Sequence, residues 1–360
     1  MDENGTGVPR GHRTVKALAT LDDLSRQIIV ALQQDGRASW TAIAAACDTS
    51  VPTVARRVQQ LIADGVMRVA VMASLGSTGP VETFFARIGC RPGTQFEVAE
   101  QLVGRDDIRY AGLITGPYDI AVELVVPAGA TRYPRTMLEV QRIEGVERWY
   151  SDLILHVYKI THDWSQQLLD ATAPVPHRAT EEPTCAPEHL DKLDVAILRV
   201  LREDGRASFK AVADALEINE STVRRRFERM INDGCASVVT LVPAAALGLE
   251  TETLLTVTVQ PAKLSSVAQS LAQHRSVRYL AATLDGNSLL CEVIASSTRG
   301  LFEFTTATLA ELDGVIGWSS SVELLSLKRG FVEAPWWRAQ LAEDRTIRNG
   351  RTLPLAAEPR

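Results

Sequence analysis

The stretch that decides the fold is Leu21–Gly65, which reads LDDLSRQIIVALQQDGRASWTAIAAACDTSVPTVARRVQQLIADG. A second copy begins 169 residues later, at Leu190–Gly234, and reads LDKLDVAILRVLREDGRASFKAVADALEINESTVRRRFERMINDG. From Leu21 to Val66, 20 of 46 positions are identical to their partners at this offset, and the alignment needs no gap. Chance does not produce such a match, so the chain is a duplication of one unit.

Each copy predicts three short helices joined by tight turns. In the first copy, Leu24, Ile28 and Leu32 recur at helical spacing, and Asp35-Gly36 ends that helix. Ser39 is placed to cap the second helix. The apolar positions of the second copy repeat the pattern at Leu193, Ile197, Leu201, Val212, Leu216, Val223, Phe227 and Met230. The helical pattern alone fits either a helix-turn-helix or a three-helix bundle with no DNA role.

The third helix of each copy favours DNA binding, because hydroxyl and guanidinium groups gather opposite its apolar stripe. Arginine bonds to guanine O6 and N7 or to a phosphate, so such a face suits the major groove. The predicted DNA-binding residues on these helices are Ser50, Thr53, Arg56 and Arg57 in the first copy and Ser221, Thr222, Arg224, Arg225 and Arg226 in the second. The first copy carries 4 basic and 5 acidic residues, and the second carries 9 of each, so the predicted basic face is narrow.

Arg37 and Arg206 occupy the same place in the repeated Asp-Gly-Arg-Ala-Ser turn ahead of the second helix. A guanidinium at this place has two alternatives, a contact with the DNA backbone or an ion pair with Asp35 or Asp204. The sequence leaves both open, and we count the two arginines among the predicted DNA-binding residues.

Downstream of each helical trio, the pattern changes to period two. Residues 120–124 and 255–260 alternate as half-buried strands do, and helical stretches lie at 95–103, 133–142, 264–272 and 301–312. The order strand, helix, strand, strand, helix, strand predicts a ferredoxin-like βαββαβ sandwich. The predicted fold class is therefore α+β, a tandem duplication of a winged or three-helix helix-turn-helix domain followed by a ferredoxin-like domain. Further pairs at the same offset are Arg109-Tyr110 with Arg278-Tyr279, Glu123 with Glu292, Trp149 with Trp318, and Lys159 with Lys328.

The predicted domain boundaries follow from this repeat. They are a tail at 1–20, helix-turn-helix domains at 21–68 and 189–238, ferredoxin-like domains at 80–162 and 250–332, a linker at 163–188, and a tail at 333–360. Prolines disfavour a helix between Ala173 and His189. The arginines of Arg345–Arg351 are expected either to contact a phosphate or to form a solvated chain end.

Composition excludes several classes of protein. With 46% hydrophobic and 23% charged residues, the 360-residue chain is globular rather than disordered or collagen-like. We expect a cytoplasmic protein with no membrane partner, because the sequence shows neither a signal peptide nor a long apolar run. The five cysteines are far apart, so neither a disulfide framework nor a zinc ribbon is expected. The formal charge is −6, so any DNA binding must use a local basic face.

At these residues the chain resembles the Lrp/AsnC (feast/famine) family of transcription regulators. The matching features are the two helix-turn-helix motifs and Thr115-Gly116-Pro117-Tyr118-Asp119 before the third sheet strand. The family usually carries one unit per chain and forms dimers that build octamers, so the resemblance implies a fused pair that forms homo-oligomers. It also implies an amino-acid effector near that turn, with Gly116, Tyr118 and Asp119 as the effector-binding residues. The second unit departs from the pattern, since it reads LDGNS at Leu284–Ser288.

The predicted function is a sequence-specific DNA-binding transcriptional regulator modulated by a small metabolite. Its predicted DNA partner is a double-stranded operator with an imperfect palindrome, because the two recognition helices differ. Two alternatives stay open: a sirohaem decarboxylase-like enzyme, which two-unit relatives resemble, and a metabolite sensor that has lost DNA binding. Residues 110–126 and 279–295 contain none of the histidines that such decarboxylases use for the tetrapyrrole. We find no nucleophile elbow, P-loop, dinucleotide fingerprint or metal-ligand spacing, so we expect no enzyme activity, cofactor or metal.

Overall fold

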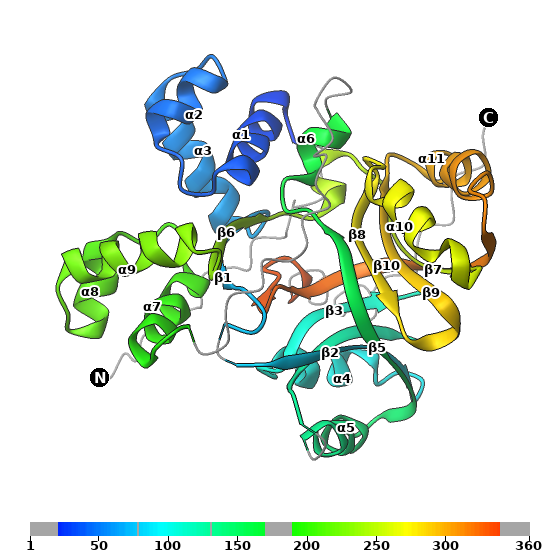
Figure 1. Ribbon diagram of the computed structural model, residues 1–360. Coiled ribbons are helices and arrows are strands. Elements are labelled where there is room, and N and C mark those ends of the chain that lie inside the picture. The colour runs from blue at the N-terminus through cyan, green and yellow to red at the C-terminus, as the bar shows by residue number, and fades with distance from the viewer. Residues whose placement is uncertain (1–20, 78, 130–131, 170–188, 339–360) are drawn as a thin grey trace, which may run out of the picture.

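The computed structural model describes residues 21–77, 79–129, 132–169 and 189–338 (Figure 1). The whole predicted tail at 1–20, most of the predicted linker, and residues 339–360 of the second predicted tail, with the arginines of Arg345–Arg351, lie outside these residues. No helix in the described part of the chain is both long and apolar enough to cross a membrane.

Two trios of helices form the domains that we call head 1 and head 2, as the repeat predicts. Polar side chains cap most of these helices; in head 1, Asp22, Ser39 and Ser50 each accept a hydrogen bond from a backbone amide of the first turn. The helices of head 1 are α1 (Asp23–Gln34), α2 (Trp40–Ala46) and α3 (Val51–Ala63). The helices of head 2 are α7 (Lys192–Glu203), α8 (Phe209–Leu216) and α9 (Glu220–Asn232).

A two-stranded ribbon, which the sequence pattern does not predict, joins the heads. Strand β1 (Arg68–Ala73) follows head 1 and pairs antiparallel with β6 (Ala236–Leu241), which follows head 2. The turn of head 2 packs so tightly on this ribbon that a Cβ at Gly205 would lie 2.7 Å from the amide nitrogen of Ala70. Glycine is therefore required at position 205, and the ribbon holds the two heads together.

Each unit continues into the predicted ferredoxin-like domain, and the tandem α+β fold is confirmed. The first domain consists of β2 (Val81–Cys90), α4 (Gln95–Val103), β3 (Ile108–Ile114), β4 (Ile120–Pro127), α5 (Arg132–Gln141) and β5 (Val146–Ile160). The second consists of β7 (Thr251–Val259), α10 (Leu264–Ala272), β8 (Val277–Thr283), β9 (Ser288–Ala295), α11 (Thr298–Glu303) and β10 (Val315–Arg329). The helix expected at 301–312 is displaced, because α11 passes into a wider π-helical turn at Phe304–Leu309.

The two sheets join into one closed ring of strands. β5 pairs with β2 of its own unit and with β8 of the other unit, while β10 pairs with β7 of its own unit and with β3 of the other. The ring order is β10, β3, β4, β2, β5, β8, β9 and β7, and β7 returns to β10. Helices α4 and α10 cover the outer faces, so the inner faces of the two sheets meet within one chain.

Two predicted boundaries are wrong because aromatic residues extend the folded domains. Helix α6 (Trp164–Leu169) lies inside the predicted linker, and its buried Trp164 packs into the core of head 1. Strand β11 (Val332–Glu333) ends the second unit, and the predicted tail after it contributes Trp336 and Trp337 to the core of the first sandwich. The first unit therefore ends against its own head, whereas the second unit ends against the sandwich of the first unit.

Candidate functional site

The outward face of α9 carries most of the DNA-binding residues predicted for head 2. Ser221, Arg224 and Arg225 are exposed, and Thr222 is half-buried. The Arg224 guanidinium donates to Glu220 Oε1 at 2.8 Å and lies 4.9 Å from the centre of the Phe209 ring. These groups are available to a ligand in solvent, so the structure permits their predicted contact with bases.

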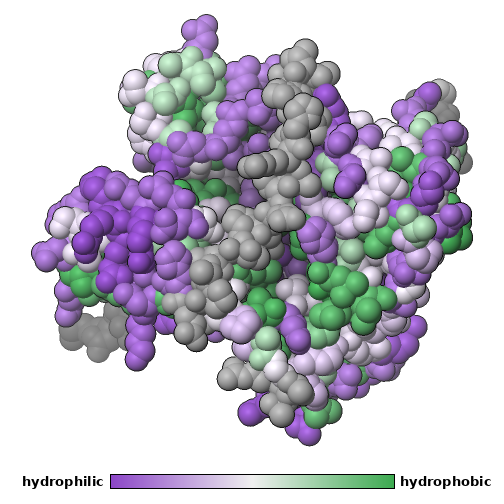
Figure 2. All heavy atoms as spheres, viewed as in Figure 1, coloured by the Kyte–Doolittle hydropathy of each residue, from purple (hydrophilic) through white to green (hydrophobic). Residues whose placement is uncertain are grey.

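The corresponding face of α3 is less polar. Arg56 is exposed and Thr53 is half-buried, whereas the Ser50 hydroxyl caps the helix by accepting from the Thr53 amide at 3.3 Å. Val51 and Ile62 are also exposed on this helix. Figure 2 shows the difference, since the surface of head 2 is strongly hydrophilic while much of the visible surface of head 1 is pale or green.

Arg57 and Arg226 occupy equivalent positions in the two heads and form ion pairs within them. Arg57 donates to Asp22 Oδ2 at 2.6 Å. Arg226 donates to Asp191 Oδ2 at 2.7 Å and to Asp194 Oδ1 at 2.9 Å. These pairs fasten each recognition helix to the start of the first helix of its head. A DNA contact by either arginine therefore has to compete with its ion pair.

Arg37 and Arg206 form contacts that the sequence did not suggest, because each side chain crosses to the opposite head. Arg206 donates to Gly36 O at 2.6 Å and to Ala38 O at 2.9 Å, and its guanidinium lies 3.9 Å from the centre of the Trp40 ring. Arg37 makes the reciprocal bonds, to the carbonyls of Gly205 and Ala207. We call this reciprocal pair the arginine clasp. Both guanidiniums are thus engaged between the heads.

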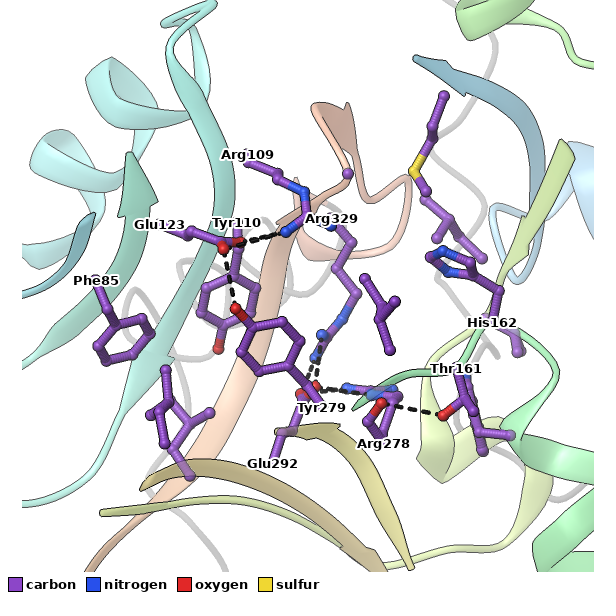
Figure 3. A pocket seen from close by; sticks show the side chains of 18 of the residues that line it. Phe85, Arg109, Tyr110, Glu123, Thr161, His162, Arg278, Tyr279, Glu292 and Arg329 are labelled. Atoms are coloured by element: carbon purple, nitrogen blue, oxygen red, sulfur yellow. Dashed lines mark hydrogen bonds and ion pairs between the residues drawn. The ribbon is translucent and has the colours of Figure 1, made fainter. Parts of the chain in front are cut away.

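A partly open cavity of about 100 Å³ lies between the two units, at the end of the strand ring that faces the ribbon (Figure 3). Its polar wall contains the residue pairs that the duplication retained, from β3 and β4 of one unit and from β8 and β9 of the other. The polar side chains that line it include Arg109, Tyr110, Glu123, Thr161, His162, Arg278, Tyr279, Glu292 and Arg329. Met72 and Leu241 of the ribbon also line it, so the cavity touches the element that carries the heads.

Ion pairs connect the two units across this cavity. Arg109 donates to Glu123 Oε2 at 3.0 Å, and Arg278 makes the equivalent pair with Glu292. The Tyr279 hydroxyl then donates to Glu123 Oε1 at 3.2 Å, which links the second unit to the first. The retained Arg-Tyr and Glu positions are therefore two halves of one network (Figure 3).

The second unit adds charges that the first unit lacks. Arg329 donates to Glu292 Oε1 at 2.8 Å, to Glu323 Oε2 at 2.9 Å and to Glu252 Oε2 at 3.1 Å. At the repeat offset, the first unit has Ile160, Ile154 and Thr83 in place of Arg329, Glu323 and Glu252. The network is thus asymmetric, although its two halves share one origin.

Burial and charge set the protonation of this network. Burial raises the pKa of Glu323 to about 7, although Arg329 opposes the shift. Burial also lowers the pKa of His162 to about 4, so that imidazole is neutral at physiological pH. Arg278 and Arg329 outweigh burial at Glu292 and lower the pKa of that carboxyl.

The predicted effector turn lies at the other end of the β3–β4 hairpin from this cavity. Asp119 Oδ2 accepts a hydrogen bond from the Cys90 amide at 2.7 Å, and Arg148 lies 5.3 Å from the centre of the Tyr118 ring. Gly116 has φ +106°, which suits its place in the turn. The predicted effector-binding residues therefore do not line the cavity. In the sequence, the cavity is indicated only by the Arg-Tyr and Glu residues that both copies share.

The heads, the ribbon and the paired sandwiches define a two-headed helix-turn-helix protein with a partly open cavity between its two units. A family model for the AsnC-type helix-turn-helix domain matches residues 21–62 and 190–231. An uncharacterized HTH-type transcriptional regulator of Pyrococcus furiosus is 33% identical over 141 residues, which are 39% of this chain and 95% of that protein. A second one, from Pyrococcus horikoshii, is 30% identical over 39% of this chain and 89% of its own length. The chain belongs to the Lrp/AsnC family of transcriptional regulators and carries the family unit twice.

A solved structure covers both units together. The siroheme decarboxylase NirDL aligns with 89% of this chain and 99% of its own, at a TM-score of 0.56 and 10% identity. At this identity the likeness shows that the two-unit fold is shared, and it shows nothing about activity.

Proposed function

We propose that the protein is a sequence-specific DNA-binding transcriptional regulator whose two heads read the two unlike halves of one operator. The observation that carries this proposal is the arginine clasp, which holds two helix-turn-helix domains in a fixed relation with their recognition helices exposed. Paired heads of this kind read half-sites about one helical turn apart, or a multiple of it.

The two heads differ in what they offer to a base pair. Head 2 presents Arg224 and Arg225 with Ser221, whereas head 1 presents Arg56 beside exposed Val51. Each bidentate arginine contact contributes roughly 1–3 kcal/mol of discrimination between bases. We therefore assign the stricter reading to head 2 and expect an imperfect palindrome as the operator.

We further propose that a small metabolite controls this binding. We predict, from what the family resemblance implies, an amino-acid site at Gly116, Tyr118 and Asp119. The cavity is a second candidate, because its wall joins both units and the ribbon beneath the heads. A wall of paired arginines and glutamates beside apolar residues suits a compact zwitterion.

An enzyme of the sirohaem decarboxylase type is the less favoured alternative. An engineered cavity of about 150 Å³ holds one benzene molecule, and the cavity here measures about 100 Å³. A tetrapyrrole is several times larger than benzene, so it would have to widen this partly open cavity or protrude from it. The sequence relatives reported above are named as regulators, which agrees with a role outside catalysis.

Fluorescence anisotropy tests the proposal. We would measure binding to DNA from upstream of the protein's own gene and to random DNA across a salt series, with the full chain and with R224A/R225A. Specific binding that this variant weakens, with a shallower salt dependence, supports the proposal. The matched control is R199A, which removes an exposed arginine of α7. Equal binding to both DNAs at every salt concentration, or an equal loss in the control, refutes it.

A further inference from the structure

A cluster of three different metal-ligand types lies in head 2, away from the reading face and from the cavity. Asp233 is the C-cap of α9, and Cys235 follows two residues later at the start of the ribbon. His189 comes from the other end of the domain, just before the N-cap of α7. The fold of head 2 thus brings together residues that are more than 40 positions apart in the chain.

The three side chains already contact one another. Cys235 Sγ lies 3.0 Å from His189 Nδ1, and His189 Nε2 lies 3.7 Å from Asp233 Oδ2. One potential ligand atom from each residue can be chosen so that all three lie within 4.8 Å of one another. Zinc bonds of about 2.0–2.3 Å in tetrahedral geometry place neighbouring ligand atoms roughly 3.3–3.7 Å apart, so the most widely spaced of these atoms would have to approach by about 1 Å.

The surroundings permit a metal ion to enter. The side chains of His189 and Asp233 are 36% and 43% exposed, whereas the residue Cys235 is buried. A second cluster of carboxylates, at Glu252, Glu292 and Glu323, has similar spacing. Its oxygens accept hydrogen bonds from Arg278 and Arg329, so that cluster is an ion-pair network and carries no proposal.

We propose that His189, Asp233 and Cys235 bind one divalent cation of borderline softness, of which Zn²⁺ is the best match. Thiolate, imidazole and carboxylate together favour Zn²⁺ over Mg²⁺ or Ca²⁺, which prefer oxygen ligands alone. On binding, the Cys235 thiol loses its proton to solvent, and the resulting thiolate forms the metal–sulfur bond. Three protein ligands leave a fourth tetrahedral position for a water molecule.

The site is specific to the second unit. Head 1 keeps the carboxylate as Asp64 but has Val66 in place of the thiol. In head 2, a bound ion would join the end of the recognition helix α9 to the start of α7, which are also connected through the ion pairs of Arg226 and Arg229. The metal would therefore stabilise the head to which we assign the stricter reading of DNA.

Cobalt absorption tests the site without DNA, so the result does not depend on the proposed function. The reduced full chain, freed of metal by a chelator, is titrated with Co²⁺ as a spectroscopic substitute for Zn²⁺. We expect a thiolate-to-cobalt charge-transfer band that saturates with one ion per chain and disappears when Zn²⁺ is added. The band is absent from C235S, and D233N and H189Q bind at least about tenfold more weakly.

The matched control is D64N, which changes the equivalent carboxylate of head 1 and leaves the cobalt titration unchanged. Because C235S removes a buried thiol, circular dichroism establishes that each variant is folded. Where C235S does not fold, D233N and H189Q decide, since both change partly exposed side chains. No charge-transfer band in the folded full chain, or unchanged Co²⁺ affinity in folded D233N and H189Q, overturns the proposal.

Discussion

Replacing Arg206 by alanine removes one half of the arginine clasp and weakens the docking of the two heads, while the bonds of Arg37 and the ribbon remain. The change removes hydrogen bonds of 2.6 and 2.9 Å to Gly36 O and Ala38 O, together with the contact on the Trp40 ring at 3.9 Å. In this partly exposed setting, each bond contributes about 1 kcal/mol and the ring contact about 0.5–1 kcal/mol. The total of about 2.5–3 kcal/mol corresponds to a shift of about 60- to 150-fold toward undocked heads.

The assay compares two operators in fluorescence anisotropy, one selected for tight binding and one with half a helical turn inserted between its half-sites. In the native protein the insertion rotates one half-site away from its head, so affinity falls sharply. In R206A the heads are held less tightly against each other, so the insertion lowers affinity less. R206K has an intermediate effect because a lysine cannot donate to both carbonyls in the fork geometry of arginine. The reasoning is refuted if R206A keeps the full penalty for insertion, or if R199A loses it equally.

Three further predictions concern the stability of the chain, each measured as a change in thermal or denaturant unfolding. E292Q leaves Arg278 and Arg329 without their shared carboxylate and lowers the free energy of unfolding by about 3 kcal/mol. The control E303Q, at the exposed pair with Arg299, changes the free energy of unfolding by less than about 0.5 kcal/mol. Similar losses in both variants would contradict a stabilising role for the network. Between pH 7 and 4.5 the raised pKa of Glu323 makes stability rise as pH falls, while the lowered pKa of His162 makes it fall from pH 6.5 toward 4. In E323Q, stability should therefore fall as the pH is lowered, and in H162Q it should rise. Identical profiles of stability against pH in the two variants would disprove these pKa shifts. G205A places a methyl group 2.7 Å from the Ala70 amide nitrogen and costs about 1–3 kcal/mol, while G317A, with open space around it, is the control that should remain stable.

Local patterns in the sequence were sufficient to predict the two heads and the order of the sandwich elements. Helical spacing at Leu24, Ile28 and Leu32 and the cap at Ser39 act over a few residues, so one copy of the unit is enough to recognise them. The ribbon was missed because its two short apolar strands form a sheet only with each other, across a distance of 168 residues from Arg68 to Ala236. The boundaries at Trp164 and Trp337 were missed for the same reason, since their partners lie in distant parts of the chain.

The candidate sites likewise differ in whether local sequence was enough to predict them. The reading residues of α9 follow from one helix and its periodicity, and their exposure agrees with that analysis. Arg37 and Arg206 were considered only beside their neighbours in sequence, whereas their partners are carbonyls in the opposite copy. The cavity needed the closed ring of strands, because Glu123 and Tyr279 meet only when both units are folded together.

The exchange of β5 and β10 between the two units has a consequence for how unlike heads stay together. Separate chains of two kinds would associate by mass action into three kinds of pair, and dilution would favour the free chains. Here a single polypeptide supplies both partners, so only the mixed pair forms within a chain and its stoichiometry is fixed at synthesis. At low copy number the two reading surfaces therefore remain joined, and each half of the gene is free to diverge without losing its partner.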